Sequence, residues 1–409
     1  MSYLLVAAVV AVVTCVLPPT SSAVDRTLTL EQALALARER APVLVSARAR
    51  IDEASGRLRG ASTLLRENPV VEGWAGPRTT PGEDQTTDLR FGLAQTFQLG
   101  GERGARIAGA NADRARAIAA SEQATLDLLR DVATAFYRAL YAGERLRLAT
   151  EAESLSVDVV RIAERRYQTG DVARLDVNLA RTALSRARAG FHSAASVSDM
   201  AVGDLRRLMG MNVEETIIVR GDLRNRREFD LAELLARASD RPDLRALAAE
   251  VEQADADVRI GGAQRWPELT LGIAWEREAT SEIGLGLVGL TIPIFDHGQG
   301  LRDESRARSR RLLGEYGALQ RTIAVEVQTG FSVYRRTVAA VQELEQNALP
   351  LLDEDEALVY RGYESGQLGL SELLLLRHEV IGTRIEYLAR LLDAAVAGVE
   401  LQMSAGVLQ

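Results

Sequence analysis

The chain has 409 residues, enough for two or three domains of ordinary size, and a formal net charge of −8. Only 5% of the residues are aromatic and Pro is rare, whereas Ala, Leu, Arg and Glu are abundant, which favours long helices over compact globular domains. One Cys and three widely spaced His exclude a Cys/His zinc cluster and a disulfide framework. All 49 strongly basic residues are Arg, which excludes chemistry that needs a Lys, and the acidic balance argues against nucleic acid as the main partner.

The first 23 residues are predicted to be a secretory signal peptide. They carry no charged side chain, and the apolar run from Leu4 to Leu17 is shorter than the ~20 residues that a spanning helix needs. Small residues then precede Val24, as a signal-peptidase site requires. The residues before Cys15 loosely resemble a lipoprotein cleavage box, so two fates stay open for Cys15: lipidation, or removal with the signal peptide.

The rest of the chain is predicted to be two copies of one plan, residues 24–215 and 229–409, joined by a polar linker at 216–228. The segment after Thr27 is echoed by the segment after Glu228, which places Pro42 opposite Pro242. Repeats of this kind indicate a fold built from similar units.

The sequence predicts the same secondary-structure elements in the same order in each copy. Short helices end at a Pro, a β-hairpin follows, and a long helical hairpin completes the copy. The β-hairpins span 68–99 and 267–295, and the helical hairpins span 101–209, with a tip near 170, and 299–406, with a tip near 366. Pro350 is expected to kink or break the helix in which it lies. Helices of this length need neighbours along their whole length, so we expect coiled-coil packing.

The strands predict a membrane environment. In residues 88–99, apolar side chains such as Phe91 and Leu93 alternate with polar or small ones, and residues 268–276 repeat the pattern. Such strands suit a barrel that presents one face to lipid and the other to a water-filled lumen, with a sheet of a soluble domain as the alternative. The three Trp residues lie at strand positions where either an interfacial aromatic belt or simple packing accounts for them.

Four strands cannot close a barrel in lipid, because the unpaired edges would leave backbone groups without partners. Three copies would supply twelve strands. The predicted fold is therefore mainly α-helical, with duplicated long helical hairpins forming a tunnel and four strands per protomer forming a 12-stranded membrane barrel in a homotrimer.

The chain resembles the TolC family of outer-membrane efflux proteins over essentially all of residues 24–409. The resemblance rests on the duplicated short helix with its Pro, the junction at 96–103 (TFQLGGER) with its counterpart at 290–298, and the two Tyr-x-x-Gly tips. The junction is most similar to the CzcC/CusC-like branch of heavy-metal efflux.

The resemblance implies a passive, non-enzymatic exit duct in the Gram-negative outer membrane with a large periplasmic portion. It would contact outer-membrane lipid and couple through a periplasmic adaptor protein to an inner-membrane pump of RND or ABC type, exporting metal ions or small toxic compounds. Two alternatives stay open: the outer-membrane component of a type I protein secretion system, and a soluble periplasmic coiled-coil scaffold.

The helix tips are the predicted gate and adaptor-docking site. Gly170 and Gly366 lie where each hairpin must reverse, which demands a positive φ. Asp176 and Glu372 each follow their Gly by six positions, so a trimer would hold two rings of three carboxylates that favour cations. The alternative role for both acids is to complement a helix N-terminus.

By resemblance, Tyr363 and Asp176 match positions that hydrogen-bond in the closed state of the family. Where some members add an Arg-centred link, this chain has Leu175 and Leu368, which suggests an apolar contact. No cofactor or metal site is predicted. Residues 284–289 match a GxGxxG pattern, but a strand follows it, which excludes a dinucleotide site.

Overall fold

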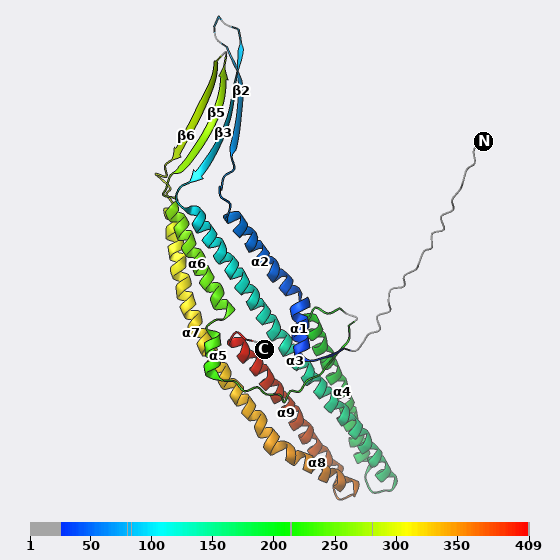
Figure 1. The fold of residues 1–409 in the computed structure, drawn as a ribbon. Helices are drawn as coiled ribbons and strands as arrows, with labels where there is room; N and C mark the ends of the chain where they lie inside the picture. Colours follow the sequence, from blue (N-terminus) through cyan, green and yellow to red (C-terminus); the bar gives the residue numbers. More distant parts are fainter. Residues whose placement is uncertain (1–25, 80, 83, 213–214, 280, 408–409) are drawn as a thin grey trace, which may run out of the picture.

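The structure is a computed structural model that describes residues 26–79, 81–82, 84–212, 215–279 and 281–407. The predicted signal peptide and Cys15 lie outside the described residues. The molecule is elongated: a sheet forms one end, the tips of two helical hairpins form the other, and short helices lie alongside the middle (Figure 1).

The two halves run through matching elements. The first half contains β1 (Arg26–Leu28), α1 (Leu30–Arg40), α2 (Pro42–Ala61), β2 (Val70–Arg78), β3 (Thr86–Gln98), α3 (Glu102–Gln168) and α4 (Arg174–Leu208). The short strand β4 (Ile217–Val219) precedes α5 (Leu231–Ala238), α6 (Pro242–Ala263), β5 (Glu268–Glu278), β6 (Ser281–Thr291), α7 (Gln299–Glu343), the π-helical turn η1 (Leu344–Ala348), α8 (Leu349–Glu364) and α9 (Leu370–Ser404). The predicted fold class, mainly helical with a few long strands, is confirmed.

Local sequence signals explain where the short helices begin. Thr29 caps α1: its hydroxyl accepts a hydrogen bond from the Gln32 amide, and the Gln32 side chain accepts one from the Thr29 amide. Pro42 and Pro242 occupy the first positions of α2 and α6, where the missing N–H of proline is not needed.

The long helices start at matched glycines. Gly101 precedes α3 and Gly298 precedes α7, and both have φ = 76°, a left-handed conformation that disfavours side chains. A Cβ atom at Gly298 would also overlap the carbonyl oxygen of Gly261 on α6. Glycine at these positions therefore lets the chain turn from a strand into a helix that packs closely on its neighbour.

Pro350 modifies its helix without breaking it. It lies in the first turn of α8, directly after the π-helical turn, in which the Leu349 amide donates to the carbonyl of Leu344. A proline cannot donate the regular helical bond, and a wider turn accommodates this defect. The helical path from α7 to the second tip is therefore continuous but locally irregular.

The sheet is antiparallel throughout, with the strand order β2-β3-β5-β6. The central pair, β3 and β5, comes from different halves of the chain, with Phe91 opposite Trp275 and Leu93 opposite Ile273. The outer strands β2 and β6 each pair on one side only within this sheet. A small separate sheet joins β1 and β4 in parallel.

The two faces of the main sheet differ in chemistry. Phe91, Leu93, Ile273 and Trp275 share one face and are 37–68% exposed, and the rings of Phe91 and Trp275 stack with centroids 6.3 Å apart. The opposite face of the same two strands carries small residues, with Gly92 opposite Ala274 and Ala94 opposite Gly272. An exposed apolar face of this kind requires a membrane or a partner.

Trp74 and Trp275 lie on opposite faces of the sheet. Trp74 pairs with Arg90 on the polar face, whereas Trp275 pairs with Phe91 on the apolar face. Trp266 precedes β5 and is 53% exposed. A single aromatic belt therefore does not contain both Trp74 and Trp275.

Apolar clusters hold the helices together along the molecule. Near the middle, Phe136 of α3 packs with Leu34 of α1 and Met209 at the end of α4. In the second half, Tyr334 of α7 packs with Leu234 of α5 and Leu401 of α9. Within the described residues, none of the helices combines the length and apolar character needed to cross a membrane.

Candidate functional site: the hairpin tips

The two tips have nearly the same backbone geometry. Gly170 has φ = 82° and Gly366 has φ = 80°. In each tip the amide after the glycine donates to a carbonyl five residues earlier, Asp171 to Arg166 and Gln367 to Gly362, both at 2.8 Å. This is the Schellman arrangement that ends a helix at a left-handed glycine.

Asp176 and Glu372 cap the helices that leave the tips. The Asp176 carboxylate accepts a hydrogen bond from the Ala173 amide at 3.2 Å, and Glu372 accepts one from the Gly369 amide at 2.8 Å. Both acids are the third residue of their helix, α4 and α9, where a negative charge also complements the helix dipole. These bonds are those of acids that complement a helix N-terminus, the alternative that the sequence left open.

Tyr363 is the buried centre of the tip region. It is 1% exposed, whereas Tyr167, its counterpart in the first tip, is 46% exposed. Apolar residues from both hairpins surround it: Val159, Ala163, Val177, Ala180, Leu370 and Leu373. Burial raises the pKa of the Tyr363 hydroxyl, and the nearby Arg166 opposes this shift.

Arg166 connects the two tips. Its guanidinium carbon lies 5.4 Å from the centroid of the Tyr363 ring, and Nη1 donates to the Tyr363 carbonyl at 3.3 Å. Within the described part of the chain, no hydrogen bond joins the Tyr363 hydroxyl to Asp176, the bond that the family resemblance implies. In this protomer an arginine of the first hairpin, and not an acid, holds the tyrosine of the second.

The two leucines differ in their environment. The Leu368 side chain covers Gly362, so closely that a Cβ atom there would come within 2.7 Å of Leu368 Cδ1. Leu175 is 65% exposed at the start of α4. Leu368 is therefore packed against its own hairpin, while Leu175 is free to contact another molecule.

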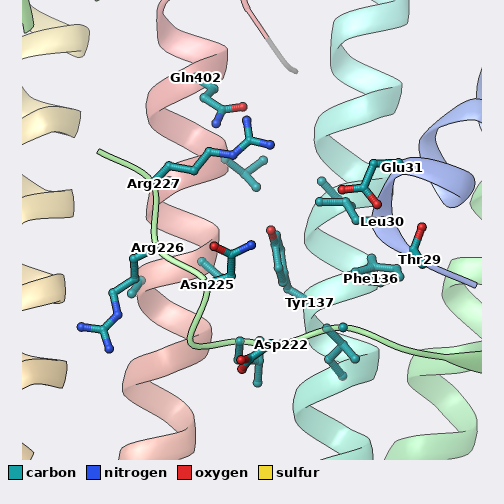
Figure 2. A pocket seen from close by; sticks show the side chains of 18 of the residues that line it. Thr29, Leu30, Glu31, Phe136, Tyr137, Asp222, Asn225, Arg226, Arg227 and Gln402 are labelled. Atoms are coloured by element: carbon teal, nitrogen blue, oxygen red, sulfur yellow. The ribbon is translucent and has the colours of Figure 1, made fainter. Parts of the chain in front are cut away.

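Residues 220–229, which we call the strap, connect the two halves and run across α3 and α9 (Figure 2). Arg226 donates to both carboxylate oxygens of Glu345 in η1 at 2.5 and 2.7 Å, and the Tyr387 hydroxyl donates to Glu345 at 2.8 Å. Arg224 in turn donates to the Tyr387 hydroxyl at 3.2 Å. The strap thus fixes the irregular turn that precedes Pro350.

A cavity of about 360 Å³ lies between the strap and the helices. Tyr137 of α3 and Asn225 of the strap point into the same space (Figure 2). The sequence predicted only a polar linker here, because nothing local in residues 216–228 indicates which helices the strap contacts.

In the part of the chain that the structure describes, no three His, Cys, Asp or Glu side chains gather in a way that could hold a metal ion.

The long helical hairpins with matched turns and the sheet with an exposed apolar face define the class of outer-membrane channels with a periplasmic helical tunnel. The model of the family "Outer membrane efflux protein" matches residues 33–211 and 234–407, one segment in each half. The chain belongs to this family. It is accordingly an outer-membrane efflux protein and not an enzyme, as the sequence predicted.

Relatives of known name support this assignment. The chain is 27% identical over 372 residues to the cobalt-zinc-cadmium resistance protein CzcC of Cupriavidus metallidurans, covering 88% of this chain and 86% of CzcC. It is also 27% identical over 297 residues to the pyoverdine export outer membrane protein OpmQ of Pseudomonas aeruginosa, covering 66% of this chain and 62% of OpmQ.

Solved structures share the fold. The CusC structure superposes with a TM-score of 0.77 at 18% identity, covering 92% of each chain. The open state of the MtrE outer membrane channel of Neisseria gonorrhoeae superposes with a TM-score of 0.75 at 19% identity, covering 92% of this chain and 88% of MtrE.

Proposed function

We propose that three copies of the chain form a passive exit duct, with a 12-stranded barrel in outer-membrane lipid and a helical tunnel in the periplasm. The observation that carries this proposal is the main sheet, which exposes an apolar face and pairs β2 and β6 on one side only. In lipid, unpaired strand edges are costly, and pairing β6 of one copy with β2 of the next removes all of them.

The duct would work as the outer component of a tripartite system, joined by a periplasmic adaptor to an inner-membrane pump of RND or ABC type. The energy would come from the pump, since a passive channel supplies none. The turns between α3 and α4 and between α8 and α9 lie at the end of the molecule opposite the sheet (Figure 1). These turns, which contain Gly170 and Gly366, are the proposed docking surface for the adaptor.

The proposed cargo is metal ions or small toxic compounds. Resistance to cobalt, zinc and cadmium and export of pyoverdine are the roles that the names of two relatives state. In a trimer, Asp176 and Glu372 would each recur three times around the tunnel and would favour cations there.

The proposed gate combines the contacts within each protomer with contacts between protomers. Arg166 and Tyr363 would hold the two hairpins of one copy together in the closed state. The exposed Leu175 would contact the Leu368 region of a neighbouring copy, sealing the tip with apolar side chains.

Deletion and complementation test this function. Cells without the gene should accumulate Co²⁺, Zn²⁺ or Cd²⁺ and grow poorly in their presence, and a plasmid copy should restore tolerance. Unchanged accumulation of these ions, with the protein assembled in the outer membrane of the parent strain, would overturn the metal-cargo proposal.

A further inference from the structure

The buried seam of α9 contains two arginines where apolar residues are expected. Leu370, Leu373, Val380, Tyr387 and Leu391 are buried, and their spacing follows the three-and-four pattern of a coiled coil. Arg377 and Arg384 occupy the two remaining positions of the same pattern. Charged groups at seam positions weaken the packing, so their presence calls for a physical explanation.

Arg384 has a partner within the protomer, but Arg377 has none among the described residues. The guanidinium of Arg384 lies 3.0 Å from the Glu356 carboxylate of α8. Asp158 of α3, the other acid near Arg377, pairs with Arg161 at 2.6 Å. Arg377 is only 8% exposed and takes part in neither a hydrogen bond nor an ion pair in the described part of the chain.

Burial of Arg377 has an electrostatic consequence. Loss of contact with water lowers the pKa of its guanidinium, and Glu356, Tyr360 and Asp158 compensate only in part. A buried cation without a bonded counter-ion is among the more costly arrangements in a protein. An anionic group supplied from outside the protomer would remove this cost.

Arg377 lines a cavity of about 640 Å³ between three helices. Leu155 of α3 and Leu376 of α9 contribute apolar walls, and Tyr360 and Arg361 of α8 contribute polar groups. The carboxylate of Glu356 also lines the cavity, where its charge is balanced by the ion pair with Arg384. This volume and this mixture of apolar walls with a few polar groups are typical of sites for small organic ligands. All of these residues belong to one protomer.

We propose that this cavity binds a small organic carboxylate, whose head group pairs with Arg377 and whose apolar body contacts Leu155 and Leu376. Arginine presents two parallel N–H groups that match a carboxylate, and such charge-assisted pairs are strong when shielded from water. The site lies between α8 and α9, close to the tip at Gly366, and is separate from the Arg166–Tyr363 contact.

The test is ¹⁹F NMR titration of the purified full-length protein in detergent with 4-fluorobenzoate, with the neutral 4-fluorobenzamide as the matched probe. We expect saturable binding of the benzoate and at least about tenfold weaker binding of the amide. Arg377→Gln should weaken benzoate binding by a similar factor, and Arg377→Lys should weaken it less.

Two further variants separate binding from folding. Ala357 lines the cavity and is exposed, so Ala357→Trp adds a bulky side chain there and should block benzoate binding while Arg377 is unchanged. Arg390→Gln removes a surface arginine on the same helix and should have no effect.

Three results would overturn the proposal: equal binding of both probes, equal benzoate binding by the Arg377→Gln variant and the parent protein, or an absence of saturable benzoate binding. The last result would point to an acidic side chain of a second copy or of a partner protein as the counter-ion.

Discussion

The guanidinium of Arg166 lies over the ring of Tyr363 and also donates to its backbone carbonyl, so one side chain of the first hairpin holds the tip of the second. In the internal repeat, Arg166 corresponds to Gly362, and Tyr167 corresponds to Tyr363. The repeat has therefore diverged at the tips, with an arginine on one hairpin and a buried tyrosine on the other.

Removing the Arg166 side chain should loosen the closed state. A cation–π contact of this kind contributes about 0.5–2 kcal/mol, which is enough to shift a balanced equilibrium several-fold toward opening. We predict that Arg166→Ala raises the mean conductance of the channel in planar bilayers. Arg165→Ala, a change to the exposed neighbour, is the control and should leave the conductance unchanged. Equal currents in both variants would refute the role of Arg166.

Tyr363 should act through its ring and its backbone more than through its hydroxyl. Tyr363→Phe keeps the ring under Arg166 and the carbonyl that Arg166 binds, so we predict near-normal conductance. Tyr363→Ala empties a fully buried site and should destabilise the tip by about 3–5 kcal/mol. If Tyr363→Phe opened the channel as strongly as Tyr363→Ala, a hydroxyl-based lock to Asp176 would be the better account.

Two pairs of substitutions distinguish the charge of the tip acids from their capping role. Asp176→Asn with Glu372→Gln removes the charge but keeps an oxygen that can accept the capping bonds, whereas Asp176→Ala with Glu372→Ala removes both. If the acids form cation-favouring rings, the variant Asp176→Asn with Glu372→Gln should be blocked less strongly by divalent cations in bilayers than the parent protein. A phenotype confined to the alanine pair, with a cost of about 1 kcal/mol per cap, would leave capping as their only role.

The strap should loosen at acidic pH. Burial alone would raise the pKa of Glu345, but the hydrogen bonds from Arg226 and Tyr387 outweigh it, and the pKa lies below its ordinary value of 4.5. A group with a lowered pKa stabilises the fold above its unfolded pKa, and this stabilisation is lost as the pH falls through the folded value.

Hydrogen exchange measured at several pH values checks this expectation. Protection of residues 220–229 should be constant from neutral pH down to about 5 and should fall below about pH 4. Glu345→Gln should already be less protected at neutral pH and should show a flatter pH response. A strap in the parent protein that stays equally protected down to about pH 3 would contradict the role of Glu345.

The features that the sequence predicted correctly depend on local physics. Glycine at a positive φ, proline at the start of a helix and alternating strands leave a direct trace in the order of residues, as Gly366 and Pro242 show. The face of the sheet on which Trp74 lies could not be predicted in this way. Val70 and Val71 are adjacent apolar residues in β2, so the alternation does not say which face Trp74 occupies, and only the pairing with Arg90 on β3 decides it.

The contacts that sequence reasoning missed all join segments far apart in the chain. Arg166 and Tyr363 are separated by 197 residues, and Arg226 and Glu345 by 119. The expected role of Asp176 as a partner of Tyr363 also depended on long-range packing, whereas its capping bond to Ala173 is local. The position of Arg166, four residues before the tip glycine Gly170, was the only local signal that it belongs to the tip. Its partner Tyr363 could not be inferred from spacing.

Native mass spectrometry of the protein extracted from the outer-membrane fraction tests the central claim most directly. The account predicts an assembly of three identical chains that stays together in mild detergent and separates only on heating. A monomer recovered from the soluble periplasmic fraction would contradict it, because a single four-stranded sheet with open edges cannot form a pore.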